Sequence, residues 1–166
     1  MASPGPAFLL AQLGAHAARR FAERVAELDL TPPQAGLLRS VAREPGLSQQ
    51  ALAAHLGTPP TRVVALVDGL EERGLVERRR NLADRRLHAL HLTEAGAALL
   101  REIGRVGAAH EDALLAALAL LRREQLRGLL SRVVEEQRLT EGVHPGYRTL
   151  RDTRASDRET PGPVVR

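Results

Sequence analysis

Residues 48–74, SQQALAAHLGTPPTRVVALVDGLEERG, limit the fold more than any other part of the sequence. The small residue Ala53 is followed four positions later by Gly57 and, six positions after that, by the β-branched Val63. Two helices that pack near a right angle need a small residue where they cross and a glycine in the turn, where φ is positive. The inward-facing positions at helical spacing are Leu52, Ala53 and Leu56 before the turn, and Val63, Leu66, Val67 and Leu70 after it. The stretch therefore predicts a helix–turn–helix.

Further helices precede this pair. Apolar residues recur at three- and four-residue steps over 5–28, which predicts a first helix. Thr31 is the expected N-cap of a second helix, which has two prolines in its first turn and runs to about residue 43. Ser48 should cap the first helix of the pair, and the second should run over 58–73 and stop at Gly74.

A change of pattern after Gly74 predicts a β-hairpin. Residues 75–79 and 87–92 are short runs with strand-like alternation, and polar residues lie between them. Thr93 should then cap a long helix, and a last helical pattern ends near Leu139. From 140 to 166 the chain has no apolar period, so we expect an irregular tail.

The amino-acid composition favours helices and excludes some kinds of chemistry. Aromatic residues make up only 2%, so Leu, Val and Ala must build the core. The sequence has no Cys, which excludes disulfides, thiolate metal sites and cysteine redox sensing. Neither a signal peptide nor a long apolar segment is recognisable, so a cytoplasmic protein without a membrane partner is the expectation.

The positive charge of the chain is concentrated in the predicted hairpin. Every basic residue is Arg, and residues 78–86, RRRNLADRR, hold five of the 24 arginines with one acidic residue. The other 19 arginines are balanced by the other 19 Asp and Glu residues, so this stretch carries the whole net charge of +4. A basic patch on an otherwise neutral protein is typical of an element that binds a polyanion.

The helix after Gly57 is the candidate recognition helix of a DNA-binding motif. Its face away from the apolar stripe carries small residues, so it can approach the floor of a major groove. Arg62 is the long donor there and suits guanine, although a contact with phosphate alone is the alternative. Val64 or Ala65 could contact a thymine methyl group. Thr61, Ser48 and Gln49 lie near helix N-termini, where phosphate is favoured.

The basic hairpin would follow this helix as the wing of a winged helix–turn–helix protein. Arg78, Arg79 and Arg80, on the strand leading to the tip, suit phosphates. The tip arginines Arg85 and Arg86 suit a narrow, electronegative minor groove. Asp84, two residues before Arg86, can orient that side chain or satisfy the backbone of the turn.

The stretch from Leu30 to Leu100 resembles the MarR family of winged-helix transcriptional regulators. The most specific pieces are LVDGLEERGLVERR, the wing motif DRR and LTEAG. The resemblance implies a homodimer that binds double-stranded DNA, usually as a repressor and often with release by a small ligand. It also implies that 59–73 contacts bases, that Arg86 enters the minor groove and that Asp84 orients it. A break near 119–122 is implied in the same way, whereas the residues alone also allow one continuous helix.

The predicted fold class is mainly α with a small β-hairpin wing (α+β). A winged helix–turn–helix domain over 31–92 would be joined to a dimerisation region formed by 5–30 and 93–139, with the tail over 140–166. The last two helices carry more apolar residues than this small domain can cover: Leu114, Leu115, Leu118, Leu121, Leu126, Leu129, Leu130 and Val133. A two-fold dimer would place its recognition helices ~34–36 Å apart on a pseudo-palindromic operator.

The implied effector pocket lies between the dimerisation helices and the DNA-binding lobe. The polar residues expected there are His16, Arg19, Arg20, Gln34 and Arg39, which suit an anionic or phenolic ligand. The alternative is that these arginines are exposed or paired with Glu23 and Glu27. The six histidines show no metal-ligand spacing, so no metal is predicted.

Two other functions remain open at this stage. One is an architectural DNA-binding protein with little sequence preference, and the other is a winged-helix module whose arginines bind an acidic protein. Neither a carboxylate pair nor a Ser–His arrangement nor a phosphate loop stands out, so neither an enzyme nor a cofactor is predicted.

Overall fold

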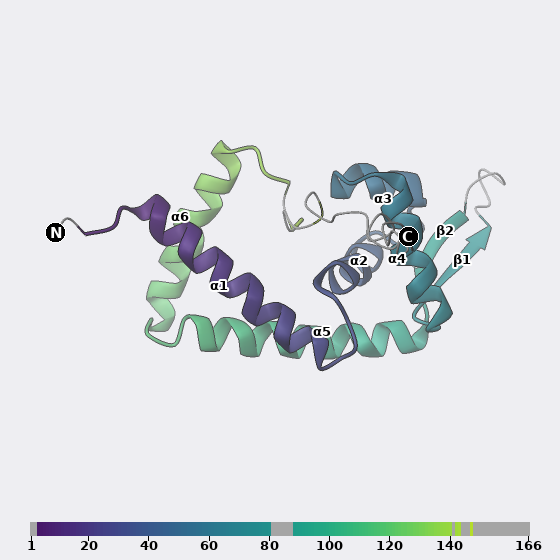
Figure 1. Ribbon diagram of the computed structural model, residues 1–166, viewed down its shortest axis with the longest axis horizontal. Coiled ribbons are helices and arrows are strands. Elements are labelled where there is room, and N and C mark those ends of the chain that lie inside the picture. Colours follow the sequence, from purple (N-terminus) through teal and green to yellow (C-terminus); the bar gives the residue numbers. More distant parts are fainter. Residues whose placement is uncertain (1–2, 81–87, 141, 144–146, 148–166) are drawn as a thin grey trace, which may run out of the picture.

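The computed structural model describes residues 3–80, 88–140, 142, 143 and 147. Within these ranges the chain forms six helices and a two-stranded antiparallel hairpin (Figure 1). Their order is α1 Pro6–Ala26, α2 Pro32–Arg43, α3 Gln49–Leu56, α4 Pro60–Glu72, β1 Val76–Arg80, β2 His88–Leu92, α5 Glu94–Leu114 and α6 Leu120–Glu136. The expected class, mainly α with a β-hairpin, is confirmed.

The helix ends follow the capping residues of the sequence. The Thr31 side chain accepts a hydrogen bond from the backbone of Gln34, whose side chain accepts one from the backbone of Thr31, so α2 begins with a complete capping box. Ser48 accepts from the backbone of Ala51 at the start of α3. Gly57 ends α3 with φ 60°, the positive value that the sequence required there.

The core lies where α2, α3 and α4 meet the hairpin. The apolar stripe expected on α4 is buried at Val63, Val67 and Leu70, and Leu66 packs against the core from a half-buried position. The other largest fully buried side chains are Leu37, Leu38, Val41, Leu52, Leu56, Leu90, Val25 and Val76. Each such aliphatic side chain contributes about 1.5–3 kcal/mol when fully buried. Tyr147 is the one buried aromatic residue of the described chain.

The hairpin is joined to the helices by backbone hydrogen bonds. Strands β1 and β2 pair in antiparallel register with Arg78 opposite Leu90. Leu90 also donates to the carbonyl of Leu47 over 3.0 Å, and its own carbonyl accepts from Gly46 over 2.9 Å. The segment before α3 therefore extends the small sheet along β2. The hairpin tip, residues 81–87, lies outside the described residues.

Helix α6 and most of α1 lie at the end of the molecule away from the hairpin, and α5 runs from that end toward the hairpin (Figure 1). Helix α5 lies along one edge, and α1 packs against it and against α2. Helices α5 and α6 are separate, because the chain leaves α5 at Leu115 and enters α6 after Ala119. Arg123 closes this turn by donating to the Leu118 carbonyl over 3.1 Å and to Asp112 over 2.6 Å. No helix in the described ranges is long and apolar enough to cross a membrane.

Candidate nucleic-acid interface and adjoining pocket

The face of α4 opposite its buried stripe is open to solvent. Thr61, Val64 and Ala65 are exposed there, and Arg62 is half-buried. The buried stripe fixes which face points outward, because residues three and four apart share one side of a helix. The exposed side chains other than Arg62 are short, so the helix backbone can come close to a groove floor. The role of each residue in base contact stays a prediction.

The N-terminal end of α3 is partly occupied by its own cap. The hydroxyl of Ser48 accepts the Ala51 amide hydrogen over 3.1 Å, so it already serves the helix. Gln49 is half-buried, and its Nε2 is buried without a hydrogen-bond partner among the described residues. Phosphate binding by Ser48 and Gln49 stays a prediction.

Arg78 connects the hairpin to α4, the candidate recognition helix. Its guanidinium contacts the carboxylates of Asp68 and Glu71 on α4, and its backbone amide donates to Glu71 over 3.1 Å. Only 20% of the side chain is exposed. Burial acts against the charge of Arg78, but hydrogen bonding and charge from the two carboxylates outweigh it and raise the pKa of the guanidinium. Arg78, which the sequence predicted to bind phosphate, is therefore held by protein carboxylates in this structure. It fixes β1 against α4.

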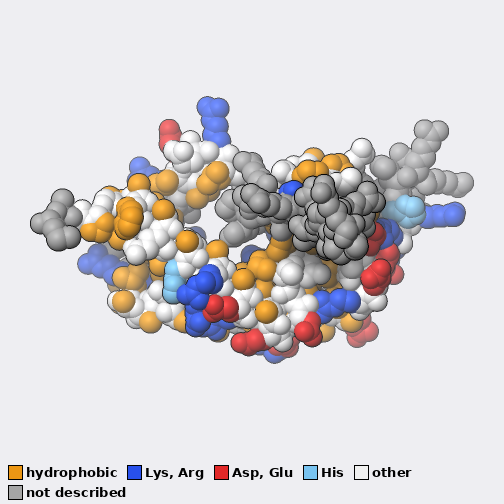
Figure 2. Space-filling view, viewed as in Figure 1, with side chains coloured by type: hydrophobic (Ala, Val, Ile, Leu, Met, Phe, Trp, Pro, Cys, Tyr) orange, Lys and Arg blue, Asp and Glu red, His pale blue; other side chains and the backbone are white. Residues whose placement is uncertain are grey.

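The other basic residues of β1 lie farther along the strand. Arg79 is exposed, and its Nη2 lies 2.5 Å from Glu77 of the same strand. Arg80 is exposed at the end of β1. Figure 2 shows basic side chains at this end of the molecule, beside the grey atoms. Asp84, Arg85 and Arg86 lie outside the described residues, so their predicted roles stay predictions.

A pocket of about 530 Å³ lies beside the helix–turn–helix, between α1, α2 and α5. Its apolar wall includes Ala17, Ala18 and Phe21 of α1, and its polar groups include Arg39 of α2 and His110 of α5. The rings of Phe21 and His110 are 5.7 Å apart between centroids. A volume in this range suits a small organic molecule.

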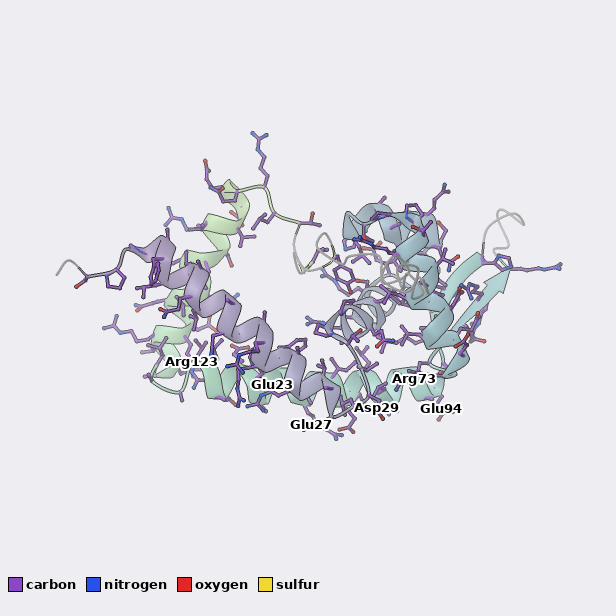
Figure 3. The ribbon with its side chains drawn as sticks, viewed as in Figure 1. Glu23, Glu27, Asp29, Arg73, Glu94 and Arg123 are labelled. Atoms are coloured by element: carbon purple, nitrogen blue, oxygen red, sulfur yellow. The ribbon has the colours of Figure 1, made fainter. Side chains whose placement is uncertain are left out.

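Of the five residues predicted to bind a ligand, only Arg39 lines this pocket. Arg19 and Arg20 contact Glu23 at 2.5 and 2.8 Å, as in the alternative that paired these arginines with acidic residues (Figure 3 labels Glu23). His16 is exposed beside Arg19. Gln34 belongs to the capping box of α2. The pocket lining and the predicted ligand residues thus share one position, Arg39.

His110 and Tyr147 are side chains of the pocket that were not among the predicted ligand residues. In the sequence His110 is one of six histidines without metal-ligand spacing, and no function was predicted for it. Partial burial and the nearby positive charges of Arg24 and Arg20 lower the pKa of His110. Tyr147 belongs to the predicted irregular tail, yet it is only 4% exposed and lines the pocket. The sole signal in the sequence was that it is the chain's single tyrosine.

Comparisons with known proteins agree with this arrangement. The model of the MarR family matches residues 28–87. The chain is 34% identical over 119 residues to the candidate transcriptional regulatory protein for the hcr operon of Thauera aromatica, a match that covers 71% of this chain and 72% of the relative.

Solved structures of two repressors have the same fold. The transcriptional repressor CouR, bound to a 23-mer DNA duplex, is 34% identical with a TM-score of 0.70, over 78% of this chain and 92% of that one. The Mycobacterium tuberculosis MarR family protein Rv2887, in complex with salicylic acid, is 27% identical with a TM-score of 0.64, over 79% of this chain and 97% of that one.

Proposed function

Because the chain belongs to the MarR family of winged-helix transcriptional regulators, we propose that it represses transcription by binding a pseudo-palindromic operator as a homodimer. Helix α4 would enter the major groove, and the hairpin β1–β2 would reach the adjacent minor groove. Similar proteins include repressors, one of them bound to a DNA duplex. Members of this family are transcriptional regulators, and such proteins are generally not enzymes.

The observation that carries the proposal is the rigid connection between α4 and β1. Arg78 contacts Asp68 and Glu71 from β1, so the helix and the basic strand keep a fixed relative position. A protein that contacts two neighbouring grooves needs this fixed relative position, because the duplex sets the spacing of the grooves. The exposed face of α4 and the exposed Arg80 then supply the contacts.

Unpaired apolar surface supports the homodimer. Helix α6 buries none of its residues within the chain. Leu120 and Leu121 are 75% and 79% exposed, and Phe8 of α1 is 62% exposed. Figure 2 shows hydrophobic side chains over α1 and α6 at the end away from the hairpin. A contiguous apolar surface of this kind is typical of an interface, so we assign 5–30 and 93–139 to dimerisation.

The pocket supports release by a small aromatic acid. Arg39 offers a fixed positive charge, and Phe21 with the two alanines offers an apolar wall. An aromatic ring with a carboxylate or phenolate fits these groups. The similar Rv2887 binds salicylic acid, which belongs to this chemical class.

Selection of bound duplexes from random DNA, at a stated salt concentration, tests the main proposal. We expect an inverted repeat whose half-sites lie about one helical turn apart, bound at least about a thousandfold more tightly than random duplex. Equal binding of all sequences would favour the architectural protein instead. An Arg62→Ala and Arg80→Ala double variant that keeps full DNA affinity would favour the protein-interaction module.

The ligand proposal needs a separate measurement. Salicylate should weaken operator binding by the wild-type protein, and Arg39→Gln should reduce this effect without abolishing DNA binding. Arg19→Gln is the matched control, because Arg19 lies outside the pocket lining and is paired with Glu23. Equal effects of the two substitutions would contradict the assignment of Arg39.

A further inference from the structure

Tyr147 is held against the body of the protein by two polar contacts. Its phenol hydroxyl donates to the carbonyl oxygen of Pro33, in the first turn of α2, over 2.6 Å. Its backbone carbonyl accepts from the Thr58 hydroxyl over 3.2 Å. Thr58 is itself buried and lies in the turn between α3 and α4, two residues before α4 begins. One residue of the tail therefore contacts both the wall of the pocket and the turn before the recognition helix.

Helix α2 is shaped to receive this phenol. Gly36 lies in its interior, where a glycine costs roughly 0.5–1 kcal/mol relative to alanine. A methyl group at Gly36 would overlap the hydroxyl of Tyr147 and press on its ring. The glycine is therefore explained by the space that the docked phenol occupies.

Gly142, a second described residue of the tail, lies near the other end of α2. Gly142 has a φ of +70°, and a Cβ atom there would lie 2.5 Å from the guanidinium of Arg43, the last residue of α2. Gly142 and Tyr147 both line the pocket, together with Gly36 and Arg39. Gly142 and Tyr147 thus lie near opposite ends of α2, and both contribute to the pocket.

We propose that Tyr147 is a ligand-contacting wall of this pocket and that its docking holds the turn before the recognition helix in place. A ligand that packs against the phenol ring stabilises the docked tyrosine, and the bond from Thr58 carries this effect to the start of α4. The pocket part of this inference rests on the proposed ligand response, whereas the hold on the turn does not.

The chain allows the docking to be measured directly. Tyr147 is the single tyrosine, and the sequence has no tryptophan, so tyrosinate absorbance reports this residue alone. Burial raises the pKa of Tyr147 above its ordinary value near 10, against an opposing effect of the Arg39 charge. In the wild-type protein the phenol should stay protonated where a free tyrosine ionises.

The decisive variant is Gly36→Ala, which expels the phenol without changing it. We expect the tyrosine to titrate near pH 10, and amide hydrogen exchange of residues 57–63 to become at least about fivefold faster. Tyr147→Ala should produce the same faster exchange, and adding Gly36→Ala to it should change nothing more. Gly104→Ala is the matched control, because nothing lies within 4 Å of the Cβ it would add.

Thr58→Val removes the bond to the Tyr147 carbonyl and leaves the pocket lining intact. It should accelerate exchange in 57–63 while the phenol still titrates at high pH. A wild-type phenol that titrates near its ordinary pKa would overturn the docking. A released phenol in Gly36→Ala with unchanged exchange in residues 57–63 would overturn the hold on the turn.

Hydrogen exchange in the presence of salicylate tests whether the ring of Tyr147 forms a wall of the ligand pocket. Salicylate should slow exchange in 57–63 of the wild-type protein and leave Tyr147→Ala unaffected. Equal slowing in both proteins would overturn the role of the ring as a ligand wall. Absence of any salicylate binding to the wild-type protein would refute the proposed ligand and this wall with it, and the hold on the turn would still be decided by the variants.

Discussion

Arg73, at the C-terminal end of α4, donates a hydrogen bond from Nη1 to the backbone carbonyl of Asp29 over 2.6 Å. Asp29 lies in the turn between α1 and α2 and has a φ of 54°, a value that few residues other than glycine adopt. Figure 3 labels both residues, which lie close together in this view. The end of the recognition helix is thereby tied to the end of α1, which belongs to the proposed dimerisation region.

Arg73→Ala should loosen the spacing between the two recognition helices of a dimer. The expected result is a smaller preference for the selected operator over the same operator with one base pair inserted between its half-sites. Competition binding of the two duplexes measures this preference. Arg101→Ala, an exposed arginine of α5, serves as the control. An unchanged preference in Arg73→Ala would show that the Asp29 contact does not set the spacing.

Arg80 and Arg78 should differ in how their removal changes the salt dependence of DNA binding. Arg80→Ala should weaken binding to all sequences and reduce the slope of log K against log salt by about 1, because one phosphate contact is lost. Arg78→Ala should also weaken binding but leave the slope unchanged, because its guanidinium is bound to Asp68 and Glu71.

Arg78→Ala and Arg80→Ala should also differ in their free energy of unfolding. Removal of Arg78 leaves two carboxylates of α4 without their partner, so the free energy of unfolding should fall by about 1 kcal/mol, with allowance for partial solvent screening. Arg80→Ala should leave it within about 0.5 kcal/mol, as is usual for exposed sites. A reduced salt slope for Arg78→Ala would instead favour the phosphate role predicted from the sequence.

The helices could be predicted because their signals are local. Thr31 with Gln34, Ser48 and Gly57 each act within four residues, and the structure places each at the expected helix end. The stripe of α4 follows from a periodicity that burial enforces. The break between α5 and α6 is not marked by glycine or proline in the sequence, and the Arg123–Asp112 contact across it joins residues 11 positions apart.

The contacts that define the site could not be predicted because they are tertiary. The sequence shows Arg78 as one of three consecutive arginines and gives no sign that it alone faces Asp68 and Glu71. The partners of Tyr147 are 89 and 114 positions away, beyond the reach of any periodicity. The charges of Arg19 and Arg20 suit an anionic ligand, but both arginines pair with Glu23 on the same helix.

Binding of an aromatic carboxylate should take up a proton at His110. The pKa of His110 is lowered by burial and by Arg24 and Arg20, so the neutral form dominates at neutral pH. An anion in the pocket opposes these charges and raises the pKa. Salicylate affinity should therefore rise as the pH falls from about 8 to about 6, through the ordinary pKa of histidine.

Calorimetry in buffers of different ionisation enthalpy measures the proton uptake. His110→Gln should remove it and flatten the pH profile. His55→Gln is the matched control, since His55 lies on α3 and does not line the pocket. A flat profile in the wild-type protein, or loss of the pH dependence in His55→Gln alone, would contradict the role of His110.

Stability should fall in alkali because of Tyr147. Its pKa is raised in the folded protein, so its contribution is complete below the unfolded value near 10 and is lost as the pH rises above it. The slope should approach about 1.4 kcal/mol per pH unit for one proton. The sequence has neither Lys nor Cys, so no other side chain ordinarily titrates between His and Arg. Chemical denaturation at pH 9 to 11.5 should show the decline in the wild-type protein, and its persistence in Tyr147→Phe would refute the assignment.

Charge introduced into α6 should separate the subunits and abolish operator binding. Leu121 and Leu129 are 79% and 61% exposed in the single chain, so Leu121→Glu or Leu129→Glu should leave the fold of one chain intact. In a dimer the same carboxylate would be buried without a partner, which costs several kcal/mol per ion. Sedimentation should then show a monomer. Operator affinity should fall to that of random duplex, because one recognition helix contacts only a half-site. A dimer that survives both leucine substitutions would place the interface elsewhere.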